Sequence, residues 1–175
     1  MRNRLRSACL FAIAIACYGG SVEAASYLGA TSLCHQGETQ YFSCRLQESR
    51  KIVSVCAAHN ISPDHGYVQY RFGTQSKIEY KFPDTLTSPR GKISIVDVSR
   101  LPDGLGSHLK FASGNYTYIV SNALVPGAVY VTKEGRVIFN HVCKGSTYLP
   151  FNGAAWQGLE YGVADWTDNF DEGSK

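Results

Sequence analysis

Apolar and polar side chains alternate along much of the chain after residue 40, which is the pattern of half-buried β-strands. The alternation is clearest in the segments 67–72 and 77–82, where every second residue is apolar: Val68, Tyr70, Phe72, Ile78, Tyr80 and Phe82. Apolar or alternating runs predict further strands at residues 41–46, 52–57, 93–98, 108–111, 116–120, 128–132 and 137–142. The chain is therefore predicted to contain about nine strands joined by short connections.

The two clearest strands are predicted to pair as a hairpin that turns about residues 73–77. In this register Tyr70 faces Tyr80 on the core side of the sheet. Arg71 then lies opposite Glu79 on the outer side, and a cross-strand pair of opposite charges supports the register. We expect this ion pair to be solvated at the surface.

No long amphipathic helix interrupts the strands, so the sequence predicts a single all-β domain of mostly antiparallel strands. A closed barrel and a sandwich of two sheets both fit the pattern. The segment 152–175 differs, because it combines acidic residues with five large apolar ones: Trp156, Leu159, Val163, Trp166 and Phe170. Since such side chains are costly to leave in water, we expect a short helix or strap packed over an open end of the β-domain.

The first 24 residues are typical of a signal peptide. Three arginines lie within the first six residues, an uncharged and mostly apolar run follows at residues 8–16, and small residues precede a cleavage site near Ala25. We therefore expect residues 25–175 to form one domain in the periplasm or after secretion. The alternative is a lipoprotein, because residues 14–17 loosely match the motif in which Cys17 would be lipidated, and membrane attachment is expected only in that form.

The predicted mature chain is nearly neutral. Removing residues 1–24 takes away three arginines and one glutamate, which leaves 14 basic and 13 acidic side chains of the original 17 and 14. Proteins that bind nucleic acid or anionic membranes usually present a strongly basic face. We therefore expect no nucleic-acid partner.

Four cysteines follow the predicted cleavage site: Cys34, Cys44, Cys56 and Cys143. An even number of cysteines in an exported domain predicts two disulfides. Four cysteines allow three pairings, and the sequence does not select among them. Their spacings match none of the close ligand pairs that zinc sites use, so we expect no metal site.

The chain carries no clear catalytic motif. The GxSxG turn of serine hydrolases is absent. Asp64 lies between His59 and His65, but residues 60–66 have the composition of a polar turn. We therefore predict a non-enzymatic protein without a cofactor. The alternative is a small hydrolase, in which the fold brings together two carboxylates that are distant in sequence.

Several segments resemble a group of small exported proteins of Gram-negative bacteria that have no assigned activity. The resemblance rests on YFSC at residues 41–44, KIVSVC at 51–56, YVQYRFG at 67–73 and KIEYKFP at 77–83. GNYTY at residues 114–118 and GAVYV at 127–131 extend it toward Cys143. It implies a periplasmic setting and supplies no reaction.

A second resemblance concerns two turns. ASGNY at residues 112–116 and TKEG at 132–135 are similar to the signature loops of the periplasmic inhibitors of C-type lysozyme, which are small β-barrels. In that family a serine of the first loop and a lysine of the second engage the catalytic acids of lysozyme, and the matching residues here are Ser113 and Lys133. The chain departs from the family by having one residue fewer before Tyr116 and by the insertion of Glu134.

The sequence therefore predicts an exported protein-binding domain, an inhibitor or immunity protein that neutralises a lysozyme or another cell-wall-degrading enzyme or toxin. The candidate contact residues lie in the two turns: Ser113, Asn115, Tyr116 and Lys133. A hydroxyl and an ammonium group suit this role, because both form charge-assisted hydrogen bonds with carboxylates. Besides the hydrolase, the other alternative is an envelope structural or assembly factor that binds through residues 152–175.

Overall fold

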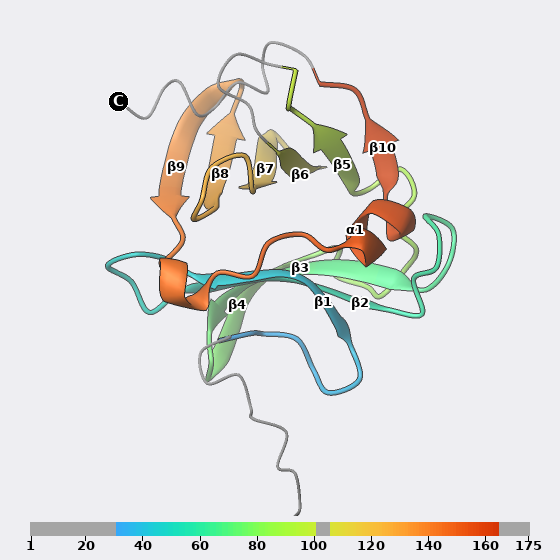
Figure 1. Cartoon of the computed structure of the whole chain (residues 1–175), viewed down its shortest axis with the longest axis horizontal. Coiled ribbons are helices and arrows are strands. Elements are labelled where there is room, and N and C mark those ends of the chain that lie inside the picture. The colour runs from blue at the N-terminus through green and yellow to red at the C-terminus, as the bar shows by residue number, and fades with distance from the viewer. Residues whose placement is uncertain (1–30, 101–105, 165–175) are drawn as a thin grey trace, which may run out of the picture.

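Two β-sheets lie face to face in the computed structural model, which describes residues 31–100 and 106–164 (Figure 1). The first sheet has four antiparallel strands in the order β1 (Thr39–Arg45), β2 (Ile52–Ala58), β3 (Tyr67–Thr74) and β4 (Lys77–Phe82). The second has six strands in the order β10 (Glu160–Gly162), β5 (Ser94–Asp97), β6 (Ser107–Ser113), β7 (Tyr116–Ser121), β8 (Ala128–Lys133) and β9 (Arg136–Val142).

The all-β prediction is confirmed, and each of the nine predicted strands is present. The described strands form two separate sheets and not a closed barrel, so the sandwich is the correct alternative. The additional strand, β10, has three residues and pairs in parallel with β5. A strand this short leaves no alternation in the sequence, and for that reason it was not predicted.

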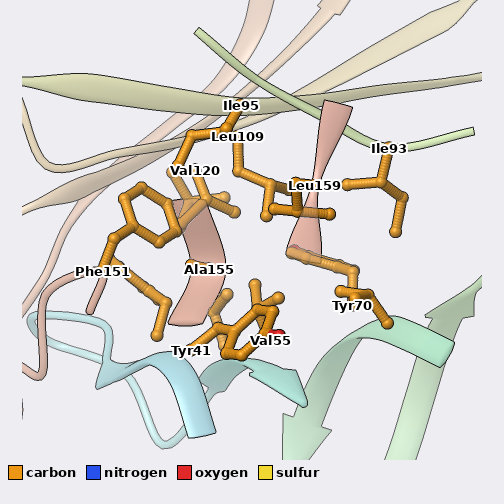
Figure 2. Packing of buried hydrophobic residues seen from close by; sticks show 14 of the residues in the cluster. Tyr41, Val55, Tyr70, Ile93, Ile95, Leu109, Val120, Phe151, Ala155 and Leu159 are labelled. Atoms are coloured by element: carbon orange, nitrogen blue, oxygen red, sulfur yellow. The ribbon is translucent and has the colours of Figure 1, made fainter. Parts of the chain in front are cut away.

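The core lies between the two sheets, where the inward faces of their strands meet (Figure 2). The first sheet contributes Phe42, Val53, Val55, Val68 and Tyr70, and the second contributes Ile95, Leu109, Phe111, Val120 and Val129. These side chains are almost completely shielded from solvent. Alternation along β2 places Ser54 and Cys56 on the opposite face, where both are also buried.

The register of the β3–β4 hairpin differs from the predicted one. Tyr70 pairs with Phe82, and not with Tyr80, because the register shifts directly before Gly73. A Cβ atom on Gly73 would lie 2.2 Å from the carbonyl oxygen of Lys77, so only glycine fits at this bulge. The alternating pattern was sufficient to predict both strands, but it gave no indication of the additional residue that a bulge inserts into one of them.

The predicted ion pair between Arg71 and Glu79 is therefore wrong. Arg71 lies opposite Lys81 in the sheet, and its side chain is not solvated, because residues 31–38 cover the outer face of the sheet. Two of its nitrogens donate hydrogen bonds to the two carboxylate oxygens of Glu38, at 2.6 and 2.7 Å. The side chains of Arg71 and Glu38 are only 3% and 5% exposed. Glu79 instead pairs with Lys51 at the surface.

Glu38 is expected to make stability depend on pH in the acid range. Burial opposes ionisation of its carboxyl, but hydrogen bonds from Arg71, Tyr67 and the backbone N–H of His35 outweigh burial and lower its pKa below the ordinary value of 4.5. A carboxyl with a lower pKa in the folded chain stabilises the fold fully above its unfolded pKa, and this stabilisation is lost as the pH falls through the folded pKa.

We therefore expect the free energy of unfolding of the wild type to fall as the pH is lowered from about 5 to about 2. In Glu38→Gln the decrease over this range should be smaller, because position 38 no longer titrates. Urea unfolding of both proteins at a series of pH values measures the two slopes. Equal slopes would show that Glu38 does not contribute to the acid sensitivity.

The two disulfides join Cys34 to Cys56 and Cys44 to Cys143, which selects one of the three pairings that the sequence left open. The first ties the covering segment 31–38 to β2. The second connects β1 to the end of β9 and thus joins the two sheets. Two disulfides are consistent with an oxidising, exported location.

The C-terminal part of the described chain contains the turn η1 (Gly145–Thr147) and the short helix α1 (Gly153–Gly158). The side chain of Asn152 caps the helix by accepting a hydrogen bond from the backbone N–H of Ala155 at 3.2 Å. Ala155 and Leu159 point into the core between the sheets (Figure 2). The prediction of a short packed helix in this region is confirmed, and Leu159 is buried as expected, whereas the expected packing of Val163 is wrong, because this side chain is 91% exposed.

Two predicted features lie outside the described residues: the signal peptide at 1–24 with the alternative lipidation site Cys17, and the part of the acidic segment that contains Trp166 and Phe170. Within the described ranges, no helix has the length and apolar character needed to cross a membrane.

Candidate binding surface

The two turns identified in the sequence are tight two-residue hairpins. In the β6–β7 hairpin Ser113 pairs with Tyr116, and Gly114 begins the turn with φ of 59°. In the β8–β9 hairpin Lys133 pairs with Arg136, and Glu134 and Gly135 have φ values of 51° and 78°. In the β8–β9 hairpin, positive φ at both central residues is typical of a type I′ turn, and in the β6–β7 hairpin a glycine with positive φ at the first central position alone is typical of a type II′ turn. The twist of both turn types matches that of the flanking strands.

The fold places these turns side by side. Tyr116 on β7 pairs with Lys133 on β8, and the backbone N–H of Glu134 donates a hydrogen bond to the carbonyl oxygen of Asn115 at 3.4 Å. The four predicted contact residues, Ser113, Asn115, Tyr116 and Lys133, therefore lie together at one end of the second sheet. Their sequence separation gave no indication of this proximity, which follows from the pairing of β7 with β8.

Register pairs connect four residues in a row across β6, β7, β8 and β9. Ser113 pairs with Tyr116, Tyr116 with Lys133, and Lys133 with Arg136. Residues directly opposite one another have side chains on the same face of a sheet. Adjacent strands are about 4.8 Å apart, so the backbones at Ser113 and Lys133 are roughly 10 Å apart. We call these residues, Ser113, Tyr116, Lys133 and Arg136, the rim row.

The rim row presents positive charge to the solvent. The ammonium group of Lys133 lies 5.7 Å from the centre of the Tyr116 ring, within the range of a cation–π contact. Neither Lys133 nor Arg136 forms an ion pair with another described residue. Tyr116 is 37% exposed. Both cations are therefore available to an anionic group on a partner.

Below the rim row, aromatic rings from both sheets form a stacked column. Phe82, Phe111, Tyr118 and Tyr80 follow one another with ring centres 4.4, 4.8 and 4.9 Å apart and with interplanar angles of 14° or less. Phe111 and Tyr118 are cross-strand partners on β6 and β7, whereas Phe82 and Tyr80 share one face of β4. The column thus joins the edge strand β4 of the first sheet to the second sheet.

An open cavity of about 400 Å³ lies beside this column, between β3 and β4 of one sheet and β7, β8 and β9 of the other. Eight of the described residues line it, all of them aromatic or aliphatic: Tyr70, Phe72, Tyr80, Tyr116, Tyr118, Val131, Ile138 and Phe139. Burial, together with the neighbouring Tyr80 phenol, raises the pKa of Tyr118 to about 12, so that this hydroxyl stays neutral at physiological pH. Tyr116 lines the cavity and is also a member of the rim row, so the cavity opens beside the rim row.

Sequence reasoning assigned the aromatic residues of this cavity to the core and did not predict a cavity. Tyr70 is buried, but Tyr80 and Phe139 are only partly buried, because β4 and β9 are edge strands. The run of exposed residues along β9 has a sequence signal: Arg136, Asn140 and His141 interrupt the apolar residues on both faces of the strand.

The segment with His59, Asp64 and His65 is a polar turn, as predicted. The Ser62 hydroxyl is hydrogen-bonded to Nδ1 of His65 at 2.8 Å. The Asp64 carboxylate pairs with Arg90, and this contact lowers the pKa of Asp64. A general acid needs a raised pKa, so this arrangement does not favour the hydrolase alternative at Asp64.

A second carboxylate, Glu160, reaches the same guanidinium at 2.9 Å. Arg90 thereby links the loop after β2 to β10, and the contacts are consistent with a structural role.

One group of three residues with metal-ligating atoms occurs among the described residues, namely Cys34, Glu38 and Cys56. The two sulfur atoms are bonded to each other, and the carboxylate is occupied by Arg71. The group therefore does not offer the thiolates that a metal would need.

The fold and the surface define a disulfide-bonded, two-sheet β-domain with two adjoining hairpin turns and an aromatic cavity. No family model, no curated protein and no solved structure matches the chain. The resemblances of the two turns and of the strand segments therefore stay predictions from the sequence.

Proposed function

We propose that the protein is an exported inhibitor or immunity protein that binds a cell-wall-degrading enzyme through the rim row and Asn115. The observation that carries the proposal is that the two turns lie side by side. Tyr116 pairs with Lys133, and the backbone N–H of Glu134 donates a hydrogen bond to the carbonyl oxygen of Asn115. This arrangement supports binding to a cleft because it brings a hydroxyl and an ammonium group together on neighbouring, tight hairpins.

The chemistry of the partner follows from these groups. The catalytic carboxylates of glycosidases are about 5 to 9.5 Å apart, the same order as the roughly 10 Å between the backbones at Ser113 and Lys133. A hydroxyl and an ammonium at this spacing match two carboxylates in a cleft. Tight hairpins lose little conformational freedom on binding, which favours affinity. A lysozyme, or a toxin that cleaves the wall in the same way, has the required pair of acids.

The double variant Ser113→Ala/Lys133→Ala tests this function. Each lost hydrogen bond to a charged group is worth about 1.5–3 kcal/mol, so we expect inhibition to weaken at least about 100-fold. The melting temperature should change little, because Lys133 is exposed, Ser113 is a small and only partly buried residue beside a turn, and substitutions at such positions change stability little. The measurement is titration of the activity of a C-type lysozyme, and of a panel of secreted wall hydrolases, with each protein.

Lys144→Ala is the matched control, since Lys144 is also exposed but lies after β9, away from the two turns. It should inhibit as the wild type does. If the double variant inhibited a sensitive enzyme as well as the wild type does, the two turns would not be the contact surface.

A further inference from the structure

The geometry points to a second binding site in the aromatic cavity, for a small molecule that combines a flat aromatic ring with an anionic group. This proposal does not rest on the proposed function, because it is argued from the cavity and from the charge beside it, although the two sites share Tyr116 and Lys133. It uses the cavity of about 400 Å³ beside the aromatic column. Small-molecule sites are typically concave, largely apolar and of about 300–1,000 Å³.

The aromatic side chains that line the cavity favour a ligand with an aromatic ring. Tyr80 is the last ring of the stacked column, with its centre 4.9 Å from that of Tyr118. Phe72 and Phe139 meet edge to face across the two sheets, with ring centres 6.1 Å apart. Offset-stacked and edge-to-face contacts are the arrangements that aromatic rings prefer. A planar ring entering the cavity would find both kinds of partner.

A polar atom on the ligand is also accommodated. The Tyr80 hydroxyl is shielded from solvent and makes no hydrogen bond of ordinary geometry within the described ranges of the chain, although it lies close enough to the Tyr118 phenol to raise the pKa of that group. A buried polar group without a partner is unfavourable, so a ligand atom that satisfies it gains binding free energy. Among the other described residues that line the cavity, Tyr70, Tyr116 and Tyr118 carry a polar side-chain atom.

The positive charge at the opening of the cavity favours an anionic ligand. Lys133 and Arg136 belong to the rim row, on the same face as Tyr116, which lines the cavity. Lys133 is held over the Tyr116 ring and forms no ion pair among the described residues. A second ammonium group, that of Lys51, lies 5.8 Å from the centre of the Phe72 ring, but Glu79 neutralises it. The uncompensated charge is therefore on the Lys133 side.

Two fluorescent probes that differ by one sulfonate group test this site. 8-Anilinonaphthalene-1-sulfonate carries the anion, and N-phenyl-1-naphthylamine is its neutral counterpart. We expect the oxidised protein, residues 25–175, to bind the anionic probe saturably at one site while fully folded. Lys133→Gln should weaken binding of the anionic probe by about 5- to 20-fold, as expected for loss of one charged contact, and change binding of the neutral probe less than about twofold.

A second variant tests the cavity itself. Ile138 lines the cavity and is 57% exposed, so Ile138→Glu can place a charge there without disturbing the core. It should weaken binding of both probes. Lys144→Gln is the control and should change neither. Absence of saturable binding, binding unaffected by Ile138→Glu, or an equal effect of Lys133→Gln on both probes would overturn the proposal.

Discussion

Removal of the disulfide between Cys44 and Cys143, by substituting both residues with alanine, is expected to lower the free energy of unfolding by about 4.7 kcal/mol. The two residues are 99 positions apart in the chain. A cross-link restricts the unfolded chain more strongly when it closes a longer loop, and the loop-closure estimate gives about this value for such a loop. The bridge also joins the first sheet to the end of β9.

The other disulfide provides the comparison. Cys34 and Cys56 are 22 positions apart, for which the same estimate gives about 3.4 kcal/mol. Urea unfolding of the two double-alanine variants should therefore show a larger loss for Cys44 and Cys143. Equal losses, or the reverse order, would contradict loop closure as the main contribution.

Replacing Arg71 with alanine is expected to lower the free energy of unfolding by about 3–5 kcal/mol, the usual cost of leaving one member of a buried ion pair without its partner. The substitution leaves the carboxylate of Glu38 without its bidentate donor, in a position where this side chain is only 5% exposed. It also removes the hydrogen bonds from Arg71 to Gln69 and to the carbonyl oxygen of Leu33. The covering segment 31–38 would then keep its disulfide but lose its central polar contact.

Lys81→Ala is the matched control, because Lys81 pairs with Arg71 across the sheet but is exposed. We expect a change within about 0.5 kcal/mol for this variant. Urea unfolding at pH 7 compares the two variants with the wild type. A loss below about 1 kcal/mol for Arg71→Ala would show that the buried ion pair is not important for stability.

The strands were predictable because one face of each lies against a common core. Val53 and Val55 on β2, and Val68 and Tyr70 on β3, alternate with polar residues and are all buried. The period of two was sufficient to place these strands. It did not predict the bulge at Gly73, since a glycine in a strand occurs both at bulges and in regular pairs.

The environment of Arg71 was not predictable, because alternation indicates only which residues share a face. It does not indicate that residues 31–38 return to cover the outer face of the sheet. A buried position for Arg71 required a partner from outside the strands, and Glu38 lies 33 positions away. The sequence contains both residues without a local pattern that connects them.

The candidate binding surface was predictable in part. The turn composition and the resemblance pointed to Ser113 and Lys133 separately, whereas their position in one row depends on the register of β7 with β8. The aromatic cavity forms because some of the rings lie on edge strands. Alternation assigns the rings of β4 and β9 to a core face whether the strand is at the edge or in the centre of a sheet, so it did not predict the cavity.

If the two turns together form a contact surface for a cell-wall-degrading enzyme, a complex with such an enzyme should depend on both turns. The most direct measurement is a pull-down with the oxidised protein, residues 25–175, against a panel of lysozymes and secreted wall hydrolases, run in parallel with Ser113→Ala/Lys133→Ala. We predict a stoichiometric complex with one hydrolase that loses its activity, and no complex with the double variant. Capture of no hydrolase, or equal capture by both proteins, would show that the two turns are not such a contact surface.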